Sequence, residues 1–247
     1  MEKCWASKYS PCGNKISREH LLTRGVFANN FTRVQGFPWC RDGEVEIGLN
    51  SLTAKILCND HNNALSPLDD IGIEATKIFY NSSFLDKEQI SPNSIIGTLD
   101  GHLFERWFLK TAINLSYKSN LHIGFGLPGS VKGEPANHLL SVVFGDIQFN
   151  NKMGLYLLNP KRSYLFQPGI IKFTPIYKDE SIGGFWFHVH GYDFFLSLFP
   201  GHAPPTFGDL GLNKFPDYLM DATPIYRPQE LDSKTEKQLK CKILFQW

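Results

Sequence analysis

The chain has 247 residues, with 25 Lys and Arg against 24 Asp and Glu, and 42% of its residues are hydrophobic. This composition indicates a globular protein of one or two domains and excludes an intrinsically disordered chain. A net charge of +1 excludes broad electrostatic capture of nucleic acid, although a local basic groove or a partner protein can still provide a positively charged binding surface. Neither a membrane helix nor a secretory signal is visible, so we expect a cytoplasmic protein with no membrane contact.

The first third of the chain predicts two short strands followed by helices. We expect strands at 15–22 and 51–57, separated by an irregular stretch, and a short helix that Asn59 or Asp60 caps. Ser66-Pro67 is typical of a fresh helix start, which predicts a break near Ser66 and a helix to about Tyr80. After a polar connection at 81–101, apolar residues at helical spacing predict an amphipathic helix at 103–118.

The second half predicts mostly β structure. Short β-branched or aromatic runs, punctuated by Gly, Pro and Asn, predict strands at 142–149, 154–158, 163–166, 170–177, 184–189 and 193–199. A loop at 201–228 and a final strand at 240–247 complete the pattern. His188 and His190 alternate with apolar residues, and we interpret them as histidines on a solvent-facing strand.

Four of the five cysteines fall in the first quarter of the chain, and clustering of this kind indicates a metal site. Cys58 and His61 form a Cys-x-x-His pair between an expected strand and an expected helix, where thiolate and imidazole can converge on one tetrahedral ion. Cys4 and Cys12 are the available second pair, and Cys40 is the reserve ligand. The alternative is that these cysteines are unliganded residues of a core.

Two segments carry a resemblance to a known family. They are SREHLL at 17–22 and LCNDHNNALSPLD at 57–69, in the order Cys, Cys, acid-His, Cys-x-x-His-Asn. This order resembles the zinc-containing type of the HNH (ββα-metal, His-Me finger) endonuclease family, over about 70 of the 247 residues. The resemblance implies that His20 is a general base, and that Glu19 and Asn62 hold a catalytic Mg²⁺ or Mn²⁺ beside a structural Zn²⁺.

The sequence departs from the family at two positions. The Asn that orients the catalytic histidine in the family corresponds to Thr53 here, and Asn50, three residues earlier, is the candidate to replace it. The Pro that usually follows the catalytic histidine is Thr23. Neither departure removes the expected base or the expected metal ligands.

The resulting expectation is an α+β fold with two parts. Residues 1–85 form a zinc-stapled ββα-metal (HNH) domain, and residues 101–247 form a helix and a β-rich domain that recognises substrate or a partner protein. The expected function is metal-dependent hydrolysis of phosphodiester bonds in DNA, and the family's frequent use in phage restriction suggests a role in antiviral defence. The alternatives are a catalytically inactive zinc-stabilised module that binds nucleic acid or protein, and an RNA-cleaving nuclease.

Overall fold

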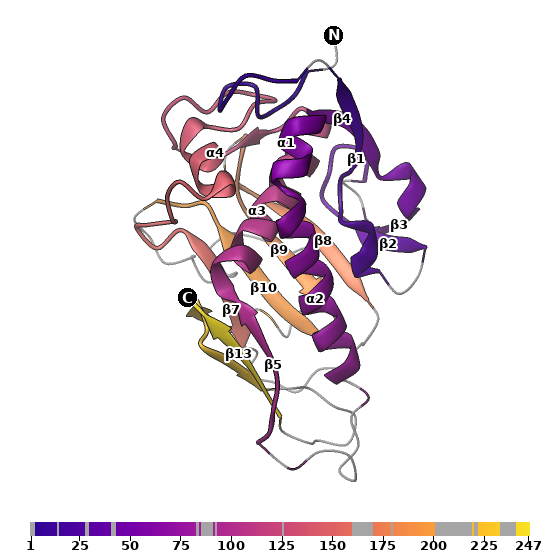
Figure 1. Cartoon of the computed structure of the whole chain (residues 1–247), viewed down its shortest axis with the longest axis vertical. Helices are drawn as coiled ribbons and strands as arrows, with labels where there is room; N and C mark the ends of the chain where they lie inside the picture. Colours follow the sequence, from indigo (N-terminus) through magenta and orange to yellow (C-terminus); the bar gives the residue numbers. More distant parts are fainter. Residues whose placement is uncertain are drawn as a thin grey trace.

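The computed structural model describes residues 3–13, 15–27, 30–40, 43–82, 84, 91, 93–124, 126–159, 170–178, 180–200, 219, 222–232 and 241–247. Within these residues the protein has a mixed α+β architecture, in which helices pack on one face of a large sheet (Figure 1). None of the helices in this part of the chain is long and apolar enough to span a membrane.

The large sheet contains strands from both halves of the chain. Its order is β11 (Thr223–Tyr226), β7 (Gly154–Asn159), β10 (Tyr192–Ser197), β9 (Ser181–Val189), β8 (Ile171–Lys178), β2 (Phe31–Val34) and β3 (Val45–Gly48), and β6 (His122–Ile123) pairs with β9. Strand β2 runs parallel to β8, so residues expected in the first domain extend the sheet of the second. One continuous core cluster also includes residues from both expected parts.

The predicted ββα segment begins with two antiparallel strands. Strand β1 (Ile16–His20) pairs with β4 (Thr53–Cys58), and helix α1 (Asn59–Ala64) follows β4 directly. Two short 3₁₀ helices, η1 (Arg24–Val26) and η2 (Leu49–Ser51), lie in the connection between the two strands. Helix α2 (Ser66–Ser82) starts after Leu65, so the predicted break near Ser66 is confirmed.

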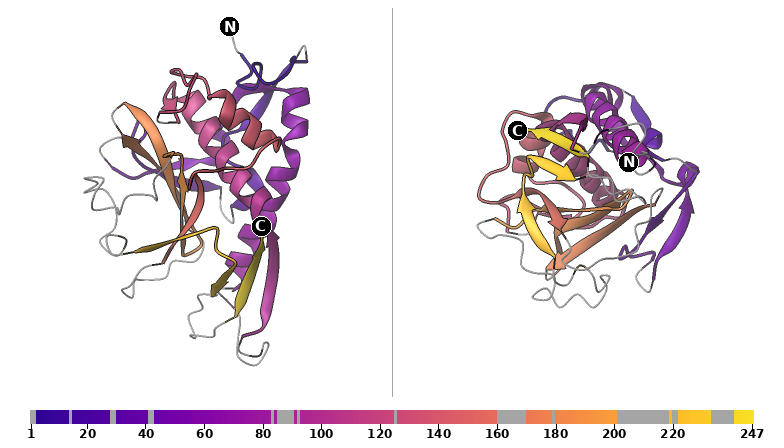
Figure 2. Two further views of the ribbon diagram at one scale, coloured as in Figure 1. Left: turned by 90° about the vertical axis from the view of Figure 1, so that its left-hand side faces the viewer. Right: turned by 90° about the horizontal axis from the view of Figure 1, so that it is seen from below.

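Helix α3 (Gly101–Lys118) packs between α2 and the large sheet, and the perpendicular view in Figure 2 shows the helices gathered on one side of that sheet. The ring of Phe108 lies 4.4 Å from that of Phe187 on β9, measured between centroids. Helix α2 approaches α3 closely because Gly72 has no side chain: a Cβ there would lie 2.5 Å from the Trp107 ring. The α3 helix therefore joins the ββα segment to the sheet.

The remaining strands form a small sheet at the far end of the molecule. Its order is β12 (Glu230–Asp232), β13 (Lys242–Gln246) and β5 (Ile95–Asp100), and β5 leads directly into α3 (Figure 1). Asp100 caps α3, since its Oδ1 accepts a 2.9 Å hydrogen bond from the backbone N–H of Leu103. The predicted helix at 103–118 and the predicted last strand are both present.

The prediction of a strand at 142–149 is wrong, because its first three residues belong to helix α4 (Asn137–Phe144) and the others follow that helix without forming a strand. A short apolar run does not distinguish a buried strand from a buried helix. Gly145, with a φ of 89°, ends the helix in the left-handed conformation that glycine tolerates best. The predicted strand at 163–166 lies outside the described residues, as does most of the predicted loop at 201–228, within which β11 forms.

The interpretation of His188 and His190 as solvent-facing residues is also wrong. Their side chains are buried, and His190 lies in the turn after β9 with a φ of 47°. The Nδ1 atom of His188 is 2.8 Å from Oδ1 of Asp193 on β10, which also accepts a hydrogen bond from the indole N–H of Trp186. A strand can be buried on both faces, which periodicity alone does not reveal.

Candidate functional site

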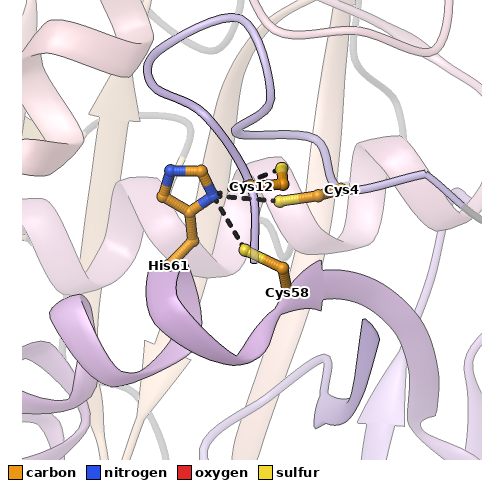
Figure 3. Close-up of side chains that lie close together, drawn as sticks. All are labelled: Cys4, Cys12, Cys58 and His61. Atoms are coloured by element: carbon orange, nitrogen blue, oxygen red, sulfur yellow. Dashed lines mark hydrogen bonds between the residues drawn. The ribbon is translucent and has the colours of Figure 1, made fainter. Parts of the chain in front are cut away.

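Four side chains predicted as metal ligands lie together at the junction of β4 and α1 (Figure 3). Their ligand atoms, the Sγ atoms of Cys4, Cys12 and Cys58 and a ring nitrogen of His61, all lie within 4.8 Å of one another. The distances from His61 Nδ1 to these sulfurs are 3.3 Å, 3.7 Å and 3.1 Å, respectively. The group can therefore hold one metal ion.

The size and chemistry of this group match a tetrahedral zinc site. Zn–S and Zn–N bonds of roughly 2.3 and 2.1 Å place tetrahedral ligand atoms about 3.6 Å apart, which is close to the distances found around His61. Soft thiolates with one imidazole are typical ligands of structural zinc. Cys40, the reserve ligand, is buried but is not part of the group.

The local fold explains why these side chains converge. Cys58 is the last residue of β4 and His61 lies in the first turn of α1, so the three-residue step between them brings both side chains to one point. The segment with Cys4 is held beside β4 by a 2.9 Å hydrogen bond from the backbone N–H of Trp5 to the carbonyl of Ile56. The first residues of the chain therefore supply half of the cluster.

Contacts around His61 fix the orientation of its ring. Ser10 Oγ lies 2.7 Å from Nε2, which leaves Nδ1 directed at the three sulfurs. With Nε2 protonated and donating to Ser10, the lone pair of Nδ1 is free for a metal ion. The ring of Phe144, from α4, meets His61 edge-on at 5.6 Å and stacks on Tyr9 at 4.1 Å. Helix α4 thus covers the candidate metal centre.

The protonation tendencies of these groups differ. Burial raises the pKa of Cys4, and burial together with the Cys4 and Cys58 thiols raises that of Cys12 to about 12. Burial also opposes ionisation of Cys58, but hydrogen bonds, first from the backbone of His61 and then from that of Gly13, bring its pKa below the usual value. Burial lowers the pKa of His61, which favours the neutral imidazole that a metal ion requires.

His20, the predicted base, is the last residue of β1 and is partly exposed. The residue paired with it across the sheet is Thr53, the position where the family carries its orienting Asn. The Thr53 hydroxyl accepts from Arg18 Nε at 3.0 Å and donates to the carbonyl of Asn50 at 3.3 Å. Asn50 itself is an exposed residue of η2, and its described contacts do not include the His20 ring.

Glu19, one of the two predicted ligands of the catalytic cation, points into the interior. Its Oε1 lies 3.0 Å from Nζ of Lys110 on α3, and that ammonium group also lies 2.7 Å from Oδ2 of Asp69 on α2. The side chain of Lys110 is only 2% exposed. Asp69 in turn accepts a 2.6 Å hydrogen bond from the Thr23 hydroxyl.

Asn62, the other predicted ligand, lies on α1 one residue after His61 and is partly exposed. Helix α1 packs against both β1 and β4, so Asn62 and His20 belong to elements in direct contact. The structure thus brings the predicted zinc ligands together. Of the four predicted catalytic residues, it places Glu19, His20 and Asn62 on the neighbouring elements β1 and α1, and Asn50 on η2. Sequence reasoning missed Ser10, Lys110 and Asp69, whose roles depend on contacts between distant segments.

None of the protein-family models, curated proteins or solved structures compared with this chain matches it. The function proposed below therefore rests on the residues of the site.

Proposed function

We propose that the chain is a metal-dependent endonuclease of HNH type that hydrolyses phosphodiester bonds of DNA. The observation that carries the proposal is the Cys₃His group at the junction of β4 and α1. A zinc ion there would hold the start of α1 against the end of β4, and so fix Asn62 relative to the β1 strand that carries Glu19 and His20.

His20 is the proposed general base. Its ring is partly exposed, and its hydrogen-bonding nitrogens have no partner among the described residues, so water can reach it. A neutral imidazole takes a proton from water at neutral pH; the hydroxide attacks phosphorus, and the bond from phosphorus to the leaving oxygen breaks. The leaving oxygen then takes a proton from solvent.

The oxygen donors of Glu19 on β1 and Asn62 on α1 match a hard divalent cation in type. Glu19 and Asn62 would hold Mg²⁺ or Mn²⁺, which when bound neutralises charge on the phosphate and the leaving oxygen. The Asn62 amide has no side-chain partner among the described residues, and only one oxygen of Glu19, Oε1, is paired with Lys110. Both residues therefore retain an oxygen for a cation.

The test is cleavage by a His20→Ala variant. We expect it to lose nicking of supercoiled plasmid in Mg²⁺ or Mn²⁺, by a factor of about 10² to 10⁴, while zinc content and thermal unfolding stay unchanged. His102→Ala is the matched control, because His102 is a partly exposed histidine at the start of α3, outside the site. Undiminished cleavage by the His20 variant would refute the proposed base, and cleavage of structured RNA in place of DNA would reassign the substrate.

One observation favours a second function, a zinc-stabilised binding module without catalysis. The ion pair between Glu19 and Lys110 gives the carboxylate a partner that is not a metal ion. A binding module predicts one tightly bound zinc and no exchangeable second cation, whereas the nuclease predicts both. Equilibrium binding of Mn²⁺ to the zinc-loaded protein distinguishes the two functions.

A further inference from the structure

Glu19, one of the proposed cation ligands, belongs to a group of three charges in which Glu19 and Lys110 are buried and Asp69 is partly exposed. Lys110 contributes one positive charge, and Glu19 and Asp69 contribute two negative charges, so the group has a net charge of −1. Burial of an ammonium group is costly unless carboxylates pair with it, and Lys110 has two such partners within 3.0 Å. Lys110 therefore has carboxylate partners that do not depend on any metal ion.

Each member of this group comes from a different element. Glu19 lies in β1, Asp69 in the first turn of α2, and Lys110 in the middle of α3. Thr23 provides a second connection between the group and α3, since its hydroxyl donates to Asp69 and accepts from the indole N–H of the Trp107 side chain at 3.0 Å. The ammonium position is thus set by the packing of three elements.

We infer that Lys110 is an internal counter-ion of Glu19, and that a divalent cation binds at Glu19 in competition with the Lys110 ammonium group. This inference rests on the proposed function, because that function supplies the cation. Lys110 is a positioning residue: it acts on the cation through Glu19 and does not contact substrate. Asp69 has the opposite effect to Lys110, because it also pairs with the ammonium group and so weakens the ion pair between Lys110 and Glu19.

The competition has a definite sign. A positive charge about 3 Å from the Glu19 carboxylate repels a cation bound to that carboxylate, even at the effective dielectric constant of about 20 that describes buried protein sites. Removing the ammonium group should therefore tighten cation binding. Removing Asp69 alone should weaken it, because Lys110 then has Glu19 as its only carboxylate partner among the residues described here.

The experiment measures Mn²⁺ binding to the full chain by electron paramagnetic resonance, after the Cys₃His group has been filled with Zn²⁺. The variant K110M/D69N removes one positive and one negative charge, so the group keeps its net charge of −1, and Met fills the space of the lysine stem. We expect its Kd for Mn²⁺ to fall at least about tenfold. D69N should raise the Kd by a similar factor.

The matched control is D70N, which removes the same charge from the exposed neighbour of Asp69 and should leave the Kd close to that of the unmodified protein. A purely structural role of the ion pairs does not move the two test variants in opposite directions. If K110M/D69N fails to fold, the Kd values of D69N and D70N for Mn²⁺ are compared instead. Equal values for these two variants overturn the inference.

E19Q separates failure of the inference from failure of the proposed function. If E19Q abolishes Mn²⁺ binding while K110M/D69N binds as the unmodified protein does, the competition is refuted and Glu19 remains a ligand. If E19Q binds Mn²⁺ with an unchanged Kd, the cation does not bind at Glu19. This result refutes both the inference and the role of Glu19 as a cation ligand in the proposed function. The role of His20 is tested independently by the cleavage assay.

Discussion

The hydrogen bond between Ser10 and His61 offers a test of the metal centre that leaves all four ligands in place. Ser10→Ala removes the oxygen that lies 2.7 Å from His61 Nε2 and changes no sulfur or ring atom. Loss of such a partner typically lowers metal affinity by a factor of roughly 10 to 100, which corresponds to about 1.4–2.8 kcal/mol. We expect the lower end of this range, because Ser10 is partly exposed and water can take its place.

The assay is competition for Zn²⁺ between the reduced protein and a chelator of known affinity. Ser7→Ala is the matched control, because Ser7 is an exposed serine in the same amino-terminal segment. Equal zinc affinities of the two variants would refute the assignment of Nδ1 as the metal-binding atom with Nε2 donating to Ser10. A loss of zinc affinity confined to Ser10→Ala would support it.

Two further predictions concern the fold. Phe108→Ala should lower the free energy of unfolding by about 3–5 kcal/mol in urea titrations, because the ring is fully buried between α3 and the sheet. Phe84→Ala, which removes an exposed ring, should change the free energy of unfolding by less than about 0.5 kcal/mol. Similar losses for the two variants would contradict the packing of Phe108. Burial lowers the pKa of His190 to about 4, so below pH 6.5 the unfolded chain binds more protons at this residue than the folded protein does. The free energy of unfolding should therefore decrease by about 3 kcal/mol as the pH falls from above 6.5 toward 4. His190→Asn, which tolerates the φ of 47°, should remove this part of the pH dependence; an unchanged difference in unfolding free energy between pH 7 and pH 4.5 would contradict it.

Elements with a strong local pattern were predictable from the sequence. The α3 helix was found because apolar residues recur at helical spacing over about five turns, and the break at Ser66 because Ser-Pro is a typical helix start. The strands β7, β8, β9 and β10 were found from aromatic and β-branched runs between turn residues. Helix α4 could not be predicted in the same way, because its short apolar run is compatible with a strand or a helix. Its role became clear only from the structure, where Gly145 ends the helix and Phe144 packs against His61.

The two histidines of β9 and its following turn show a second limit. The alternation around His188 indicates a strand correctly, but it does not say what lies on the second face of the sheet. His188 pairs with Asp193 across a tight turn, and both side chains are buried. Burial of a strand on both faces depends on the whole chain, so local sequence cannot reveal it.

At the candidate site, the sequence by itself determined the donor set. Cys-x-x-His at the start of a helix and two earlier cysteines were enough to predict which four side chains meet, because metal chemistry restricts ligand type and local geometry fixes Cys58 relative to His61. Only the tertiary structure decided the surroundings of Glu19. Lys110 follows Glu19 by 91 positions and reaches it only because α3 packs against α2 and against β4, the strand paired with β1. No local pattern encodes a contact that depends on the packing of several separate elements.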